Sequence, residues 1–215
     1  IDVSNGPFTV AFGFAPLAEF SEKASFDSVT PRFVLSYEQG GGFYYASYNR
    51  GERSGGFGSP ILAPSEPVDS EVLDNYEIGA KNTFLDGRLK TTAAVFYGKY
   101  KDIQVQLIDS DTGTVLLQNA AEGEIGGLEF DFNLQANDKL SVSGGATFLD
   151  NTFKDFPDAA VYMPFTDAQY AAGATGLTQG REDLSGERLP NSPRKSGYLA
   201  LTYSMDLGGW SNESS

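Results

Sequence analysis

The stretch GLEFDFNLQANDKLSVSGGATF, residues 127–148, contains two alternating segments separated by a short polar turn. Its large apolar residues keep one parity within each segment: Leu128, Phe130, Phe132 and Leu134, then Leu140, Val142, Ala146 and Phe148. The other parity is small or polar. Because successive residues of a strand point to opposite faces, the stretch predicts a β-hairpin with one apolar face and one polar face.

The same two-residue period recurs along the chain, at residues 76–84, 89–97 and 198–205. After Leu89 one parity stays uncharged as far as Tyr97, and Lys99 and Lys101 follow on that parity. A lysine at mid-bilayer costs roughly 2–4 kcal/mol, so a membrane-facing strand would place these lysines near lipid phosphates at its outer end. The alternation favours a transmembrane β-barrel over the alternative, a half-buried strand of a soluble β-sandwich.

The connections between the alternating segments are short and long in turn. Short turns are expected at residues 38–42, 85–87, 136–138 and 206–209, and long connections at 51–71, 108–114 and 150–196. Outer-membrane barrels combine short periplasmic turns with long extracellular loops. The sequence therefore predicts an all-β, antiparallel sheet of about seven or eight strands, with a further alternating segment at residues 8–14.

Composition excludes several classes of function. The chain has 215 residues and no Cys or His, which removes the common catalytic triads, Cys/His zinc sites and disulfide frameworks. Its formal net charge of −14 argues against binding nucleic acid, which needs a basic surface. No run approaches the roughly 18 apolar residues of a membrane helix. We expect no catalytic site, no metal site and no cofactor.

Two groups of polar residues have alternative interpretations. The run at residues 109–113, DSDTG, resembles the start of a calcium loop, but the remaining ligands do not follow and a turn is favoured. Glu77, Lys81, Glu129 and Asp131 share the polar face. They could include a catalytic carboxylate pair, but cross-strand ion pairs or contacts with a domain inside the barrel are favoured.

Four runs of sequence resemble the TonB-dependent outer-membrane receptors, in the family's order. They are FYYASYNRGERSGGFG (residues 43–58), NYEIGAKNTFLDGRLKTTAAVFYGKYKDIQV (75–105), QNAAEGEIGGLEFDF (118–132) and DLSGERLPNSPRKS (183–196). The resemblance implies a barrel of about 22 strands in the outer membrane of a Gram-negative bacterium, plugged by an N-terminal domain. It also implies TonB-driven uptake of a scarce nutrient.

We expect this chain to be a piece of a receptor that does not include the family's plug domain, TonB box and final strand ending in an aromatic residue. We therefore expect residues 30–215 to be part of a receptor barrel with long extracellular loops. Residues 1–29 are expected to be an N-terminal segment with a possible strand and loop.

The resemblance implies a receptor and transporter, not an enzyme, for a ferric siderophore or similar iron chelate. Its expected partners are outer-membrane lipid and lipopolysaccharide, TonB through the plug domain, and the chelate, in a monomeric barrel. Candidate residues for an anionic chelate lie in or beside the expected loops: Arg50, Arg53, Tyr162 and Arg181. A solvated loop surface is the alternative for each, and a secreted β-sandwich or adhesin-like module is the alternative for the chain.

Overall fold

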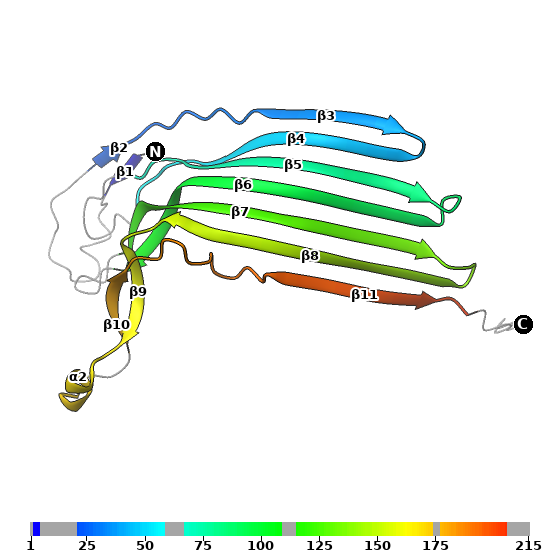
Figure 1. Cartoon of the computed structure of the whole chain (residues 1–215). Helices are drawn as coiled ribbons and strands as arrows, with labels where there is room; N and C mark the ends of the chain where they lie inside the picture. Colours follow the sequence, from blue (N-terminus) through cyan, green and yellow to red (C-terminus); the bar gives the residue numbers. More distant parts are fainter. Residues whose placement is uncertain (1, 5–20, 59–66, 109–114, 174–176, 206–215) are drawn as a thin grey trace, which may run out of the picture.

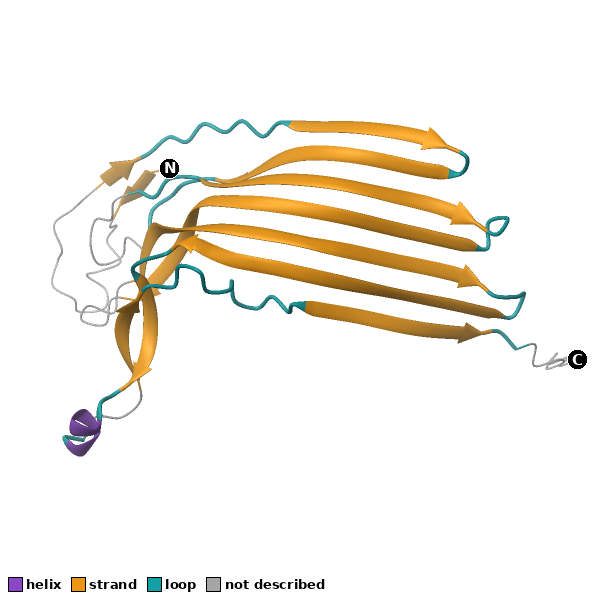
Figure 2. Ribbon diagram, in the orientation of Figure 1, coloured by secondary structure: helices purple, strands orange, loops and turns teal. Residues whose placement is uncertain are grey.

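The computed structural model describes residues 2–4, 21–58, 67–108, 115–173 and 177–205. Within this part of the chain, seven strands form one antiparallel sheet in the order β11-β8-β7-β6-β5-β4-β3 (Figures 1 and 2). The strands are β3 (Arg32–Gln39), β4 (Gly42–Arg53), β5 (Glu71–Phe84), β6 (Leu89–Ile108), β7 (Val115–Gln135), β8 (Leu140–Asp155) and β11 (Lys195–Tyr203). The predicted all-β, antiparallel fold is confirmed.

The sheet is a meander with one insertion. From β3 to β8 each strand pairs with the next along the chain, and β11 then returns to pair with β8. Between them a separate hairpin, β9 (Ala159–Pro164) and β10 (Leu177–Glu182), projects from the end of the sheet where the long connections lie (Figure 1). We call this end the loop end. The short helix α2 (Asp167–Ala171) lies between β9 and β10, and β1 (Asp2–Ser4) pairs with β2 (Ser21–Lys23).

The predicted short turns at residues 38–42, 85–87 and 136–138 join adjacent strands at the opposite end of the sheet. Leu85, Asp86 and Gly87 have positive φ in the tight turn between β5 and β6.

At the loop end, β4 and β8 continue to Arg53 and Asp155, beyond the predicted ends at residues 50 and 149. The predicted connection at 150–196 contains the end of β8, the hairpin and α2. The features predicted at residues 8–14, 109–113 and 206–209 lie outside the described residues.

The strand register assembles the two alternating parities into two faces of the sheet. Across neighbouring strands, one continuous row is Leu35, Ala46, Ile78, Val95, Leu128 and Phe148. The row beside it on the opposite face is Ser36, Tyr45, Gly79, Ala94, Glu129 and Thr147. We call these the apolar face and the polar face.

The apolar face is exposed in the described part of the chain. Leu35 and Leu199 keep 76% and 70% of their surface accessible, and many other large apolar side chains of this face are exposed. A β-sandwich would pack such a face against a second sheet. The sandwich alternative is therefore wrong, and the face has the exposure that lipid contact requires. No helix in the described ranges is long and apolar enough to span a membrane.

Aromatic rings cover glycines on neighbouring strands. A Cβ on Gly79 would lie 2.5 Å from the Tyr45 ring, which is directly across the β4–β5 pair. Gly127 on β7 is directly across from Phe96 on β6, and a Cβ on Gly127 would lie 2.7 Å from the Phe96 ring. Gly79 and Gly127 thus accommodate cross-strand rings, which explains part of the high glycine and aromatic content.

Candidate functional site

Two rows of side chains cross the apolar face near the loop end. The row farther from the loop end is aromatic, and each of its residues is opposite the next in register: Phe33, Tyr48, Tyr76 and Tyr97. The ring centroids of Phe33 and Tyr48 are 6.1 Å apart, and those of Tyr48 and Tyr76 are 5.1 Å apart. The next row towards the loop end is charged with alternating sign: Arg50, Asp74, Lys99 and Glu124.

The position of the aromatic row fits a membrane boundary. Leu89 is the first residue of β6, and the strand rises by about 26 Å from Leu89 to Tyr97 at about 3.3 Å per residue. This is the scale of the apolar band of outer-membrane barrels, which is about 25 Å tall and bordered by aromatic girdles. The charged row then begins where the band ends, and it contains the predicted interfacial residue Lys99.

Arg50 is held on the apolar face by Asp74. Its Nε and Nη2 donate hydrogen bonds of 2.8 Å to the two carboxylate oxygens of Asp74, and the Tyr48 hydroxyl donates a third of 2.7 Å. Asp74 is buried, with 8% of its surface exposed. The bidentate pair matches the fork geometry of the guanidinium group. Arg50 therefore lies on the opposite face from Arg53 and is engaged by a carboxylate of its own chain.

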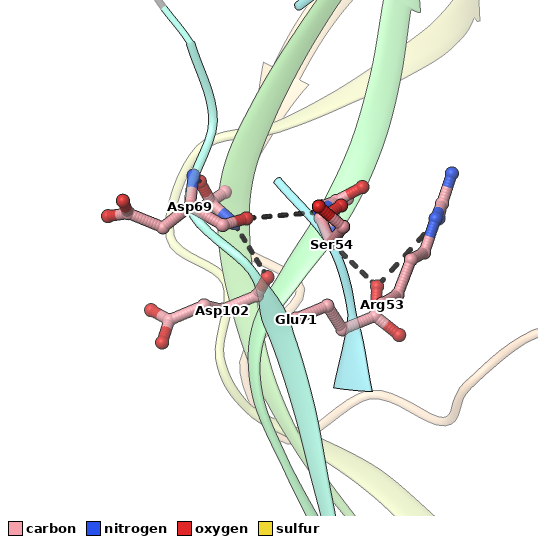
Figure 3. Close-up of polar contacts among 7 residues, drawn as sticks. Arg53, Ser54, Asp69, Glu71 and Asp102 are labelled. Atoms are coloured by element: carbon pink, nitrogen blue, oxygen red, sulfur yellow. Dashed lines mark hydrogen bonds and ion pairs between the residues drawn. The ribbon is translucent and has the colours of Figure 1, made fainter. Parts of the chain in front are cut away.

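A polar network fastens the connection after β4 to β6 and β7 (Figure 3). The Gln104 side chain donates to the backbone carbonyls of Ser54 and Asp69, both at 3.0 Å. The Asn119 side chain donates to the carbonyls of Asp69 and Asp102 at 3.0 and 2.8 Å, and it accepts from the Asp69 N–H at 2.7 Å. We call this network the loop clamp.

The loop clamp lies beside an irregularity in the β6–β7 pair. The register shifts between Tyr100 and Ile103, and Asp102 has a φ of 54°. Such a bulge bends a strand and leaves backbone groups without partners in the neighbouring strand. Here the Asn119 side chain donates a hydrogen bond to the Asp102 carbonyl. Figure 1 shows both strands bending away from the sheet at the loop end. Arg53, a predicted site residue, lies beside the clamp with its guanidinium 3.9 Å from the Glu71 carboxylate.

A small apolar core supports the loop end. It consists of the buried residues Ala121, Phe153, Phe156 and Ala159, with Ile103, Val105, Leu184 and Leu189 packed against them. The chain after β10 is tied to this core, because the Phe153 N–H donates to the Glu187 carbonyl and the Leu184 N–H donates to the Phe156 carbonyl. The loop connections are thus anchored by packing and by hydrogen bonds at their bases.

Asp183 orders the first turn of this returning segment. Its carboxylate accepts the Ser185 N–H at 2.8 Å. Hydrogen bonds from the Ser185 side chain and backbone hold the pKa of Asp183 below its usual range.

Tyr162 and Arg181 lie together on the projecting hairpin. Tyr162 is opposite Gln179 and Arg181 is opposite Ala160, so the two site candidates share one face of the hairpin. Tyr162 is 62% exposed. The Arg181 guanidinium lies 3.2 Å from the Asp158 carboxylate, in a pair whose two side chains are about half exposed or more. Exposed pairs contribute little stability, so this guanidinium remains accessible to an anionic ligand.

The predicted carboxylates of the polar face accept hydrogen bonds from tyrosines. The Tyr45 hydroxyl donates to Glu77 at 2.6 Å, and the Tyr198 hydroxyl donates to Asp131 at 3.2 Å. The structure thus shows tyrosine–carboxylate pairs on the polar face where sequence analysis favoured cross-strand ion pairs. Contacts with a domain inside the barrel stay a prediction.

Sequence reasoning did not identify Gln104 or Asn119. Both are uncharged residues within strands, and their partners Ser54 and Asp69 are 50 residues away along the chain. No local pattern carries that information.

Comparisons with known proteins agree with this architecture. A family model described as TonB dependent receptor-like, beta-barrel, matches residues 3–214. The chain is 29% identical over 145 residues to a probable TonB-dependent siderophore receptor, PiuA, of Acinetobacter baumannii, covering 67% of this chain and 17% of that protein.

Two solved structures share the fold. The siderophore receptor PiuA from Acinetobacter baumannii has a TM-score of 0.64 and 24% identity, covering 89% of this chain and 26% of that one. The ferric yersiniabactin uptake receptor FyuA from Yersinia pestis has a TM-score of 0.65 and 20% identity, covering 87% of this chain and 25% of that one. The chain thus spans about a quarter of the solved structures that it matches.

The match covers nearly the whole chain, and it agrees with the exposed apolar face, the aromatic row and the alternation of short turns and long connections. Members of this family are transport receptors of the Gram-negative outer membrane and not enzymes. The chain therefore belongs to the β-barrel family of TonB-dependent receptors.

Proposed function

We propose that the protein to which this chain belongs imports a ferric siderophore or a similar iron chelate. The observation that carries the proposal is the 29% identity, over 67% of the chain, to a receptor named for siderophores. The loop end then faces the outside, because long connections are extracellular in outer-membrane barrels. Cargo released into the cell would pass along the polar face, driven by TonB acting through a plug domain.

The hairpin of β9 and β10 is the part of this chain best suited to meet the chelate. It projects from the loop end, and Tyr162 and Arg181 share one of its faces. A guanidinium offers charge-assisted hydrogen bonds to an anionic chelate, and a phenol ring adds stacking or cation–π contact. Arg53 lies at the base of the loops, whereas Arg50 faces the membrane side and is occupied by Asp74. We therefore assign direct contact to Tyr162 and Arg181 in preference to Arg50.

Uptake by a deletion strain tests the proposal. A strain lacking the whole receptor gene should fail to grow on at least one ferric siderophore supplied as the only iron source, and the intact gene should restore growth. Tyr162→Ala combined with Arg181→Ala should weaken binding of that chelate to the purified receptor by about tenfold or more, since each lost contact is worth about 1 kcal/mol. Unchanged growth on every ferric chelate supplied would exclude this cargo.

Arg88→Ala is the matched control for the binding measurement. Arg88 is an exposed arginine in the turn between β5 and β6, at the end of the sheet away from the loops. Its removal changes the charge by the same amount as removal of Arg181 and should leave binding unchanged. The same proposal includes the remaining expected partners, which are outer-membrane lipid, lipopolysaccharide and TonB. It also includes the expectation that the barrel is monomeric.

A further inference from the structure

The projecting hairpin carries more negative than positive charge. Its described residues and those at its two ends, 157–173 and 177–183, contain one cation, Arg181. The same residues contain four carboxylates: Asp158, Asp167, Glu182 and Asp183. A ligand that approaches Arg181 therefore also meets the charge of any carboxylate close to it, and salt screens the more distant ones.

Asp158 is the carboxylate that lies against Arg181. The Nη1 atom of Arg181 donates hydrogen bonds to the Asp158 backbone carbonyl at 3.1 Å and to the Asp158 carboxylate at 3.2 Å. Both contacts use the same nitrogen. A ligand that accepts two parallel hydrogen bonds from the guanidinium would therefore meet its other edge, formed by Nε and Nη2.

The neighbours of Asp158 fix it at the base of the hairpin. Phe156 and Ala159 belong to the small apolar core and are 7% and 1% exposed. The Phe156 N–H also donates a hydrogen bond of 2.9 Å to the Ser185 hydroxyl. The Asp158 side chain itself stays 70% exposed. Its charge is thus held beside Arg181 while it remains hydrated, and it acts on a ligand through water.

We propose that Asp158 makes the hairpin selective for iron chelates of low net charge, of the neutral ferric tris-hydroxamate type, over a ferric tris-catecholate. Three singly charged hydroxamates neutralise Fe³⁺, whereas three doubly charged catecholates leave three negative charges. The iron-bound oxygens of the neutral chelate still accept hydrogen bonds from Arg181, and Tyr162 on the same face offers a ring contact. The inference rests on the proposed import of an iron chelate and assigns the class of that chelate.

The distance between the two negative groups sets the size of the effect. A chelate oxygen bonded to Nε or Nη2 of Arg181 would lie about 7 Å from the Asp158 carboxylate, given ordinary hydrogen-bond lengths on both sides of the guanidinium. At 0.15 M salt, repulsion of three negative charges at this distance in water weakens binding about threefold. At 0.01 M salt, where screening is weaker, the same repulsion weakens binding about tenfold.

The test measures the dissociation constants of both chelates for the full-length receptor, purified in detergent, by quenching of its intrinsic fluorescence. The unaltered receptor should bind the tris-hydroxamate more tightly. Asp158→Asn removes the charge and keeps a side-chain oxygen for Arg181. It should strengthen tris-catecholate binding about threefold at 0.15 M salt and about tenfold at 0.01 M salt, and leave tris-hydroxamate binding unchanged. A merely structural role of Asp158 would not produce this dependence on salt and on chelate charge.

Asp167→Asn is the matched control. It removes the same charge from α2, at the far end of the hairpin (Figure 1). Arg181 is opposite Ala160, and β9 continues for four residues to Pro164, a rise of about 13 Å. This separation exceeds the screening length of about 8 Å at 0.15 M salt. At that salt the control should leave both dissociation constants unchanged.

Several outcomes would overturn the proposal. One is tighter binding of the tris-catecholate than of the tris-hydroxamate by the unaltered receptor. Another is an equal change for both chelates in Asp158→Asn, which would show that Asp158 only orients Arg181. A third is unchanged tris-catecholate binding by Asp158→Asn at both salt concentrations. Any of these, with one chelate bound, contradicts the role of Asp158 and leaves the proposed import standing.

Binding of neither chelate would also overturn the role of Asp158. Together with unchanged growth of the deletion strain on every ferric chelate, it would overturn the proposed import as well. Heat-modifiable migration on gels shows that each variant is folded. If Asp158→Asn does not fold, the unaltered receptor decides, because its tris-catecholate binding should strengthen as salt is raised and its tris-hydroxamate binding should not.

Discussion

Gly126 and Gly127 are neighbours in β7 with different surroundings. A Cβ on Gly127 would lie 2.6 Å from the Phe148 carbonyl oxygen, which belongs to the backbone, whereas a Cβ on Gly126 meets only ordinary contacts. We predict that Gly127→Ala lowers the free energy of unfolding by about 1–3 kcal/mol through overpacking. Gly126→Ala should change it by less than about 0.5 kcal/mol. The temperature at which the folded barrel loses its fast gel migration measures both.

Each of these alanine variants serves as the other's control, because they add the same methyl group to adjacent residues. Equal unfolding temperatures for the two would show that β7 relaxes around a methyl group at either position.

The Arg50–Asp74 pair gives a second prediction at this scale. Asp74 is 8% exposed and takes three hydrogen bonds from Arg50 and Tyr48. Arg50→Ala leaves this carboxylate without its counter-charge and should destabilise the barrel by about 2–4 kcal/mol, since breaking a buried pair costs about 3–5 kcal/mol and Arg50 is partly exposed. Thermal melting followed by circular dichroism measures the loss.

The double variant Arg50→Ala with Asp74→Asn separates the charge effect from lost packing. Removing both charges should recover part of the stability that Arg50→Ala loses. A double variant less stable than Arg50→Ala alone would show that Asp74 is stabilised mainly by Tyr48.

At the scale of elements, the loop clamp determines how firmly the connection between β4 and β5 is held. Gln104 and Asn119 contribute four hydrogen bonds from their side-chain amides to three backbone carbonyls on this connection and on β6. We predict that Gln104→Ala with Asn119→Ala makes residues 54–58 and 67–71 more susceptible to proteolysis from outside the cell, because local opening of these segments becomes easier. Limited proteolysis of intact cells with mass mapping measures this.

Gln135→Ala is the control for the clamp variant. Its side-chain amide also donates to a backbone carbonyl, that of Asn137, but in a short turn at the other end of the sheet. The cleavage pattern of the loops should not change. Equal cleavage of the clamp variant and the unaltered receptor would show that the bridge between Gly56 and Val68 holds the connection by itself.

The segment after β10 should respond to acid. The pKa of Asp183 is lowered by hydrogen bonds from Ser185, so the charged carboxylate stabilises this turn above the ordinary Asp pKa of about 4. The contribution is lost as the pH falls through the lowered pKa. Hydrogen exchange of the peptide covering residues 183–188 should therefore accelerate on acidification, after correction for the intrinsic rate. In Asp183→Asn the corrected rate should be independent of pH, and an unchanged acid response there would assign the effect to another group.

At the scale of the whole molecule, the sheet has two free edges and an exposed apolar face. β3 and β11 each pair on one side only within the described sheet, and Leu35 and Leu199 are exposed on them. Open edges and apolar surface lead to aggregation in water. We predict that the chain of 215 residues expressed alone is insoluble without detergent. Sedimentation of a detergent-free extract tests this, and a soluble, compact monomer would contradict the assignment of the apolar face to lipid.

The sequence by itself determined the strands, their faces and the alternation of short turns and long connections. These features depend on local properties: a strand turns each successive side chain to the opposite face, so a two-residue period fixes which residues share a face. The stretch at residues 127–148 therefore predicted β7, β8 and the turn between them correctly. The family resemblance depended on the same strands.

Only the tertiary structure decided which side chains meet at the loop end. The bulge near Asp102 shifts the β6–β7 register, and Gln104 and Asn119 reach carbonyls tens of residues away in the chain. The aromatic row stops at Tyr97 because Gly126 and Asp150 are the next residues in register on β7 and β8. Each of these contacts depends on the registers of neighbouring strands, including any bulge, and a strand's own alternation carries no information about its alignment with the next.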